Sequence, residues 1–299
     1  MLLLLRLCMK YKKEWEFIKM KLGCNSVIFS QLDLYGALQH ISWAGFSGAE
    51  LCHQQGWGMH VELNTKKSYI DEVKWTAKKH GVELWAIHAG FEGKTDAERI
   101  VLMTQVFDVA SKLGIPVVSI RAFGKANDKE ATKLEFKYLR EINKRAEDRG
   151  VKLSVKPHQG ASVYNTASAL QMVNEIDSPS LGVGFDPLHL TRGGDDPAET
   201  VLKLGKKIAH AQFHDCPTPL TPEQMKKLKG PRSQDSPEQQ TPGRSDVNWV
   251  KILQNFKDVG YEGAMDVHII GTATYPISRA MGRAAEARGY LHKCLQELK

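Results

Sequence analysis

The chain contains 299 residues, 42% of them hydrophobic, which is enough to bury a large core within one α/β barrel. The formal net charge is +7, but the basic residues lie in segments that also carry acids, and no basic stripe is interleaved with aromatic side chains, so nucleic-acid binding is not expected. The five cysteines are scattered and match no zinc-binding spacing, which predicts a reducing, cytoplasmic environment.

Residues 1–19 stand apart from the rest of the chain. Their apolar run, residues 2–5, is too short to span a membrane and lacks the basic start and small-residue cleavage site of a signal peptide. We interpret residues 1–19 as an N-terminal extension, or as the result of a start codon assigned upstream of Met20; an added helix that covers the barrel is the alternative. Residues 20–299 are expected to form one domain without a membrane segment.

From Lys21 onward, short apolar runs alternate with amphipathic segments, most of which end at a glycine or a turn. Strands are expected at residues 22–29, 48–52, 82–88, 116–121, 151–156, 181–186, 208–213 and 264–269. Helices are expected at residues 32–44, 68–80, 96–113, 129–149, 166–176, 197–204, 247–259 and 277–298. Eight strand–helix units predict a single-domain α/β fold, a (β/α)8 TIM barrel. A doubly wound open sheet is disfavoured because residues 30–33 contain no glycine-rich phosphate turn.

One connection is far longer than the others. Residues 216–246, after the seventh strand, are polar and rich in proline, which is typical of a lid or of a disordered excursion. Because this segment leaves the carboxyl end of a barrel strand, we interpret it as a lid over the substrate. A helix is expected inside it, with Thr221 as its N-cap and Pro222 at its first position.

The carboxyl ends of the strands carry an unusual number of polar side chains. In a barrel, these ends and the loops after them form the active face. The candidates are Glu50, His53, His88, Arg121, Lys156, His158, Asp186, His189, Gln212, His214 and His268.

Several motifs together resemble one family. They are Gly48-Ala-Glu-Leu51, Val155-Lys-Pro-His158, Phe185-Asp-Pro-Leu-His189, His210-Ala-Gln-Phe-His-Asp215, Pro242-Gly-Arg-Ser-Asp246 and Gly260-Tyr-Glu-Gly263. From residue 21 to about residue 298 the chain is similar to the sugar phosphate isomerase/epimerase family of xylose isomerase-like barrels. The resemblance implies a divalent metal bound by Glu, Asp, His and Glu from strands five to eight. In the epimerases of this family the two glutamates also move a proton beside a carbonyl group.

This chain departs from that metal-binding pattern. The four ligand positions fall on Lys156, Asp186, Gln212 and His268, so only Asp186 keeps the family residue. A protonated lysine repels a cation, glutamine offers a neutral carbonyl oxygen, and histidine is a poor copy of a carboxylate base. Two-glutamate epimerisation therefore does not carry over.

Three interpretations remain open for this site. In the first, a divalent metal (Mn, Zn, Co or Mg) is bound by a rearranged set of Asp186, Gln212 and His268, with a further histidine. In the second, the protein is metal-free, the ammonium of Lys156 replaces the cation, and His158 or His268 is the acid or base. In the third, catalysis is lost and Lys156 forms a structural salt bridge with Asp186.

The resemblance implies a sugar isomerase or epimerase that acts on a carbohydrate or polyol-derived small molecule. A lyase or dehydratase is the near alternative, because both reactions begin by removing a proton beside a carbonyl group. A non-catalytic sugar-binding or partner subunit is the alternative from another class, and a homo-oligomer is compatible with the sequence. We assign substrate binding to Glu50, His88, Arg121, His189, His214 and Arg244, the last because a guanidinium suits a hydroxyl, carboxylate or phosphate group.

Overall fold

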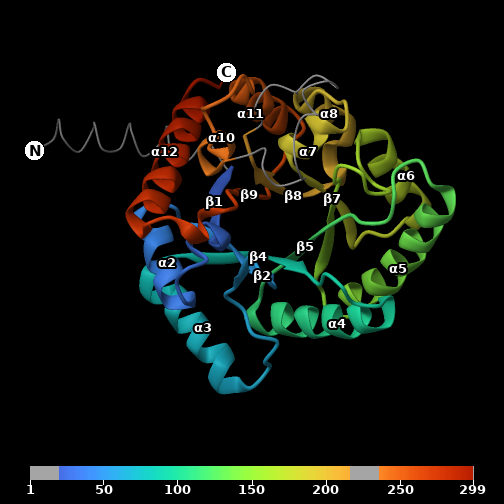
Figure 1. The fold of residues 1–299 in the computed structure, drawn as a ribbon, viewed down its shortest axis with the longest axis horizontal. Coiled ribbons are helices and arrows are strands. Elements are labelled where there is room, and N and C mark those ends of the chain that lie inside the picture. Colours follow the sequence, from blue (N-terminus) through green and yellow to red (C-terminus); the bar gives the residue numbers. More distant parts are fainter. Residues whose placement is uncertain (1–19, 216–235, 299) are drawn as a thin grey trace, which may run out of the picture.

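The computed structural model describes residues 20–215 and 236–298, and its centre is a closed barrel of parallel strands (Figure 1). The strands of the barrel are β1 (Lys21–Asn25), β2 (Gly48–Gln54), β4 (Glu83–Gly90), β5 (Val117–Arg121), β6 (Lys152–Lys156), β7 (Leu181–Phe185), β8 (Ile208–Phe213) and β9 (Ala264–Val267). Neighbours in the chain pair in parallel, and the pairing of β1 with both β2 and β9 closes the circle. The predicted (β/α)8 TIM barrel is confirmed.

A ring of helices surrounds the strands (Figure 1). These helices are α2 (Leu34–Trp43), α3 (Lys67–His80), α4 (Asp96–Leu113), α5 (Lys129–Glu147), α6 (Thr166–Ile176), α8 (Pro197–Leu204), α11 (Trp249–Asp258) and α12 (Ile277–Gln296). Helices α3 and α4 each end at a glycine in the left-handed conformation, Gly81 and Gly114, as the sequence predicted. Residues other than glycine rarely adopt this backbone conformation, so the two glycines fix where the helices end and the next strands begin.

Alternation along β8 separates the apolar core from the polar interior of the barrel. The ring of Phe213 faces outward and lies 4.8 Å from Trp249 and 6.0 Å from Phe256, both on α11. The neighbouring residue, Gln212, faces inward and reaches Glu50 on β2. Because side chains alternate along a strand, His210 and His214 share the inward face with Gln212, as expected from the period of two.

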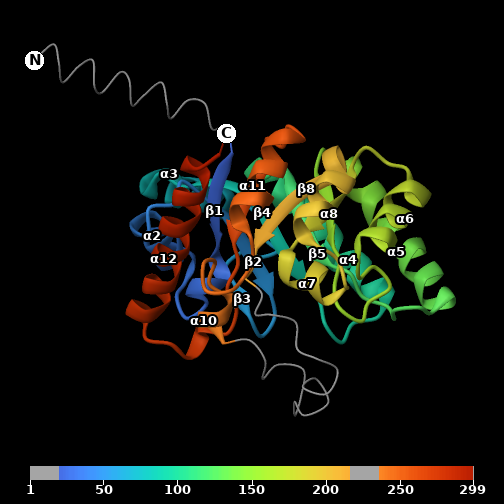
Figure 2. The same cartoon turned by 90° about the horizontal axis from the view of Figure 1, so that it is seen from above.

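The structure differs from the predicted elements near the ends of strands. Strand β1 stops at Asn25, because the side chain of Asn25 accepts a hydrogen bond from Val27 N at 2.8 Å and starts a 3-10 turn at Ser26–Phe29. Two short helices, α7 (Pro187–Arg192) and α10 (Pro237–Gln240), and the antiparallel strand β3 (Gly58–Met59) were not predicted. Figure 2 shows all three at the same end of the barrel.

Two predictions fall outside the described residues: the N-terminal extension and the lid helix at Thr221. Within the described part of the chain, no helix is both long and apolar enough to cross a membrane.

Candidate functional site

Asp186 is the centre of a buried polar cluster at the carboxyl end of β7. Its Oδ2 atom lies 3.0 Å from Lys156 Nζ, 3.4 Å from His214 Nδ1 and 4.0 Å from His189 Nε2. Lys156 is 3% exposed and Asp186 is fully buried. Burial alone would raise the pKa of Asp186, but the positive charge of Lys156, together with the contacts of His189 and His214, holds this pKa well below its ordinary value. The structure therefore contains an ion pair between Lys156 and Asp186, which belongs to two of the three interpretations of the sequence.

The local sequence after β7 explains how two members of this cluster come together. Asp186 is the N-cap of α7, and its Oδ1 atom accepts a hydrogen bond from Leu188 N at 3.1 Å. Pro187 occupies the first helical position, where a missing N–H group costs nothing. The single turn that follows brings His189 back beside the carboxylate. One short motif thus supplies both side chains.

His214 links the cluster to α10. Its Nε2 atom lies 2.9 Å from Gln240 Oε1, which also accepts a hydrogen bond from Ile270 N at 2.8 Å. The α10 helix is further held by Glu238, which accepts hydrogen bonds from the Tyr275 hydroxyl at 2.6 Å and from Arg279 Nη2 at 2.7 Å. A part of the predicted lid region, residues 236–246, is therefore anchored at the barrel mouth.

A second group of contacts crosses the barrel below this cluster. Gln212 Nε2 lies 2.7 Å from Glu50 Oε2 and 2.8 Å from His88 Nδ1. Asn25 donates to the same Glu50 oxygen at 2.6 Å, and His88 Nε2 lies 3.1 Å from Gln54 Oε1. These five buried side chains come from four strands and form one hydrogen-bonded layer.

His210 lies between two carboxylates deeper in the barrel. Its Nε2 atom is 3.3 Å from Glu50 Oε1 and 3.3 Å from Asp266 Oδ2, and Trp85 Nε1 donates to Asp266. Burial alone would lower the pKa of His210 and raise that of Glu50, but their mutual attraction raises the pKa of His210 and lowers that of Glu50 to about 2. Burial and the charge of Glu50 raise the pKa of Asp266 to about 7, against the opposing effect of His210.

The other histidines near Lys156 are held in the neutral form. Burial, followed by the positive charge of Lys156, lowers the pKa of His158 to about 4 and that of His268 well below its ordinary value. Burial also lowers the pKa of His88 to about 4 and that of His189 well below its ordinary value. The rings of His158 and His189 lie 4.2 Å apart. The imidazoles near Lys156 are therefore neutral at pH 7, and each keeps one ring nitrogen with a free lone pair.

Comparison with known proteins identifies the family of this barrel. A family model described as a xylose isomerase-like TIM barrel matches residues 38–294. The chain belongs to this family. The resemblance seen in the sequence is confirmed.

Relatives within the xylose isomerase-like family include two kinds of enzyme. An uncharacterized protein of Methanocaldococcus jannaschii is 26% identical over 275 residues, which cover 86% of this chain and 85% of the relative. D-psicose 3-epimerase of Enterocloster bolteae is 23% identical (86% and 84% covered), and inosose dehydratase of Clostridium beijerinckii is 22% identical (76% and 78% covered). The solved structure of a D-tagatose 3-epimerase-like protein superposes with a TM-score of 0.71 at 23% identity, covering 93% of this chain and 97% of that one.

The family implies a divalent metal, and three groups of side chains come close enough together to hold one. They are Asp186, His189 and His214; Glu50, His88 and His268; and Glu50, His210 and Asp266.

Each of these groups is only partly engaged: Glu50 Oε1, His189 Nδ1, His210 Nε2 and His268 Nδ1 have no hydrogen-bond partner among the described residues. In the first group, Lys156 Nζ donates to the carboxylate oxygen that faces both histidines, so a cation there would lie beside an ammonium. In the other two groups, Glu50 Oε2 already accepts hydrogen bonds from Asn25 and Gln212. Because an ammonium, Lys156, and a neutral amide, Gln212, stand at two of the four ligand positions that the family implies, the residues present do not fit the metal site of the family.

The structure does not bring the two predicted arginines into the cluster. Arg121 pairs with Glu92 at 3.2 Å. It lines a cavity of about 310 Å³ at the ends of β4 and β5. Arg244 is 40% exposed in its side chain and forms an ion pair with Glu286 on α12, away from Asp186. The assignment of Arg244 to substrate binding stays a prediction.

The loop that carries Arg244 has a structural role instead. Asp215, at the end of β8, accepts hydrogen bonds from Arg244 N at 2.8 Å and from Ser245 N at 2.9 Å, and from Trp249 Nε1 at 3.2 Å. This buried carboxylate fixes the return of the chain into α11.

Sequence reasoning missed Asp266 and Gln240. Asp266 stands two residues before His268, so the same alternation that placed His268 inside the barrel would have placed Asp266 there as well. Gln240 carried no such signal, because it lies in an irregular segment whose partners are His214 and Ile270.

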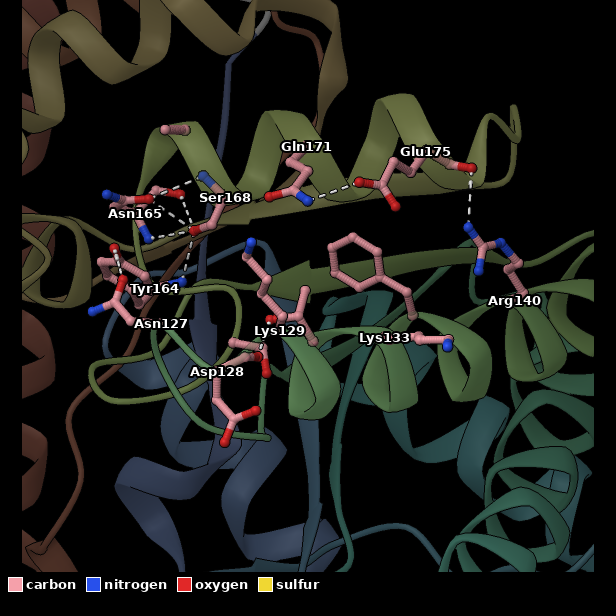
Figure 3. A pocket seen from close by; sticks show the side chains of 14 residues that line it. Asn127, Asp128, Lys129, Lys133, Arg140, Tyr164, Asn165, Ser168, Gln171 and Glu175 are labelled. Atoms are coloured by element: carbon pink, nitrogen blue, oxygen red, sulfur yellow. Dashed lines mark hydrogen bonds between the residues drawn. The ribbon is translucent and has the colours of Figure 1, made fainter.

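A larger groove, of about 640 Å³, lies on the outer surface between α5 and α6 (Figure 3). Its polar side chains serve the helices themselves. Asn165 and Ser168 form the capping box of α6, and Gln171 donates to Glu175 at 2.7 Å. We therefore place the candidate site in the barrel and not in this groove.

Proposed function

We propose that this barrel catalyses proton transfer beside the carbonyl group of a polyhydroxylated ketone, with Lys156 in the role that a divalent metal has in the family. The observation that supports this most directly is the buried ion pair between Lys156 and Asp186. It stands at the position where the family has two metal ligands. Isomerisation or epimerisation is the leading outcome, and dehydration shares its first step.

In this proposal, Lys156 stabilises the negative charge that forms on the substrate oxygen. The ammonium donates a hydrogen bond to the carbonyl oxygen as proton removal converts the ketone into an enolate. An ion in a buried site acts strongly, because little water screens it. Asp186 keeps the ammonium at this position before substrate binds. We expect the loss of the positive charge to slow the reaction by about 10²–10³-fold.

The base in this proposal is a neutral histidine. His268 Nδ1 is buried and has no hydrogen-bond partner among the described residues, and the pKa of His268 is held low by burial and by Lys156. His158 is the second candidate, and its Nδ1 atom lies 3.2 Å from Gln159 O, which leaves Nε2 as the acceptor. A neutral imidazole beside an ammonium can take a proton while the ammonium neutralises the enolate.

Hydrogen exchange at carbon tests the proposal even when the product is unidentified. We would incubate the protein in D2O with ketohexoses and inososes and follow the protons beside the carbonyl group by NMR. Exchange is expected with the parent and with Lys156→Arg, and not with Lys156→Met. Lys152→Met, on the same strand, is the matched control. Sugar binding without exchange for any ketone would indicate the non-catalytic alternative.

Metal analysis tests the rearranged metal site, the competing interpretation. The parent, purified without a metal-affinity tag, is expected to contain substoichiometric metal, and exchange is expected to survive EDTA. Stoichiometric Mn, Zn, Co or Mg that is lost in both Asp186→Ala and His268→Ala would contradict the proposed role of Lys156.

A further inference from the structure

The side-chain amide of Gln212 has only one orientation that its neighbours allow. Its Nε2 atom lies 2.7 Å from Glu50 Oε2 and 2.8 Å from His88 Nδ1. An ionised carboxylate only accepts hydrogen bonds, so a flipped amide would place two oxygens against each other. The amide nitrogen must therefore face Glu50.

The layer around Gln212 maintains this orientation. Glu50 Oε2 also accepts a hydrogen bond from Asn25 at 2.6 Å, and Glu50 Oε1 lies 3.3 Å from His210 Nε2. His88 Nε2 lies 3.1 Å from Gln54 Oε1, which makes Nε2 the donor and leaves Nδ1 as an acceptor for Gln212. Glu50 is thus held by two hydrogen bonds at Oε2 and by an ion-pair contact with His210 at Oε1, which has no hydrogen bond among the described residues.

The carbonyl oxygen of Gln212 is left without a partner. Gln212 is 1% exposed, and its Oε1 atom has no hydrogen bond among the described residues. A buried acceptor without a donor is unfavourable, and such atoms in proteins generally have a partner. Because the two arms of an amide point apart, this oxygen faces away from Glu50 and His88.

We propose that Gln212 Oε1 accepts a hydrogen bond from a hydroxyl group of the substrate, and that Glu50 is the positioning residue that directs it there. The proposal rests on the proposed function and narrows its substrate class to ketones with a hydroxyl group that can reach Gln212. Gln212 would then be a specificity-determining residue and not the metal ligand that the family position implies. Glu50, in turn, would act through Gln212 and not by direct contact with the substrate.

Paired ligands test this assignment. Dissociation constants would be measured calorimetrically for a ketohexose that binds and for its monodeoxy analogues, with the parent, Gln212→Met and Glu50→Gln. The parent is expected to bind one deoxy analogue at least about tenfold more weakly than the full sugar, since a site that binds a hydroxyl leaves a buried group unpaired without it. Both variants are expected to lose this discrimination. Gln171→Met, on the outer face of α6, is the control.

The proposal would be overturned if Gln212→Met weakened the binding of the full sugar and of the deoxy analogue by the same factor. Discrimination between the two would then be intact, which indicates a structural role for Gln212. Thermal unfolding checks that each variant is folded. If Glu50→Gln does not fold, Asn25→Ala, which removes another partner of Glu50, takes its place and is expected to reduce the discrimination.

A second experiment does not depend on sugar turnover. Crystals of the parent grown with glycerol are expected to show a glycerol hydroxyl within hydrogen-bond distance of Gln212 Oε1. Glycerol bound elsewhere, or a protein donor at this oxygen, overturns the proposal. If no ketone binds or exchanges, the proposed function fails, while the glycerol complex still decides the role of Gln212.

Discussion

Lys156 Nζ lies 3.0 Å from Asp186 Oδ2 in the interior of the barrel, and both side chains are buried. In most surface ion pairs, the loss of one partner changes stability little, because water replaces it. If Lys156 or Asp186 is replaced by a neutral residue, water cannot reach the charge that remains, and its burial is unfavourable. The pair therefore links the chemistry of the site to the stability of the fold.

We predict that Lys156→Met lowers the free energy of unfolding by about 3–5 kcal/mol, because it leaves the carboxylate of Asp186 buried and unpaired. The double substitution Lys156→Met with Asp186→Asn removes both charges and is expected to recover part of this loss. Urea denaturation at pH 7 measures both. As a control, Lys21→Met breaks an exposed pair with Glu83 and should cost less than about 1 kcal/mol. Equal effects of Lys156→Met and Lys21→Met would contradict the prediction.

We predict that Lys156→Met raises the pKa of His158. In the parent, burial and then the positive charge of Lys156 lower this pKa to about 4. Without that charge, protonation of the imidazole becomes easier, while burial still opposes it. NMR titration of the ring protons from pH 3 to pH 8 measures the change, with His292, on the outer surface of α12, as the internal reference. An unchanged titration of His158 would show that Lys156 does not control its protonation.

Gln240→Ala is predicted to loosen α10 from the barrel. Gln240 Oε1 lies 2.9 Å from His214 Nε2 and accepts a hydrogen bond from Ile270 N, so its removal takes the acceptor from one buried and one part-buried group. Hydrogen exchange followed by mass spectrometry should show faster exchange at residues 236–241 and at Ile270. Helix α5 should be unaffected, and Gln171→Ala should change neither region. Protection equal to that of the parent would mean that Glu238 and its partners hold α10 without Gln240.

The overall fold could be predicted because its signal is local. Apolar runs, amphipathic segments and glycine stops recur along the chain, and the barrel follows from their number and order. A pair of Lys156 and Asp186 could also be anticipated, because both side chains point into the barrel at the carboxyl ends of neighbouring strands. The partner of Arg121 could not, because Glu92 lies in a loop whose course no periodicity defines. Gln240 and its contact with His214 depend in the same way on an irregular segment.

The buried residues Asp266 and His210 lead to a prediction of how the stability of the protein depends on pH. The pKa of Asp266 is raised to about 7 by burial and by Glu50, so the folded protein binds a proton that the unfolded chain releases near pH 4. The contribution of Asp266 to the free energy of unfolding is therefore greatest at low pH and falls as the pH rises from about 4 to 7. The raised pKa of His210 acts in the same direction above the ordinary pKa of histidine.

Asp266→Asn should therefore flatten this slope. The free energy of unfolding of the parent would be measured by urea denaturation at pH 5, 6, 7 and 8. We expect the contribution of Asp266 to this free energy to fall by on the order of 1 kcal/mol per pH unit up to about pH 7. The variant should lack this contribution and should gain on the parent at pH 8, because an amide has no charge to bury. Asp148→Asn, at an exposed position, is the control and should keep the slope of the parent. If the slope of Asp266→Asn matches that of the parent, the carboxylate of Asp266 is already ionised in the folded barrel at pH 5, and His210 carries its charge between two anions.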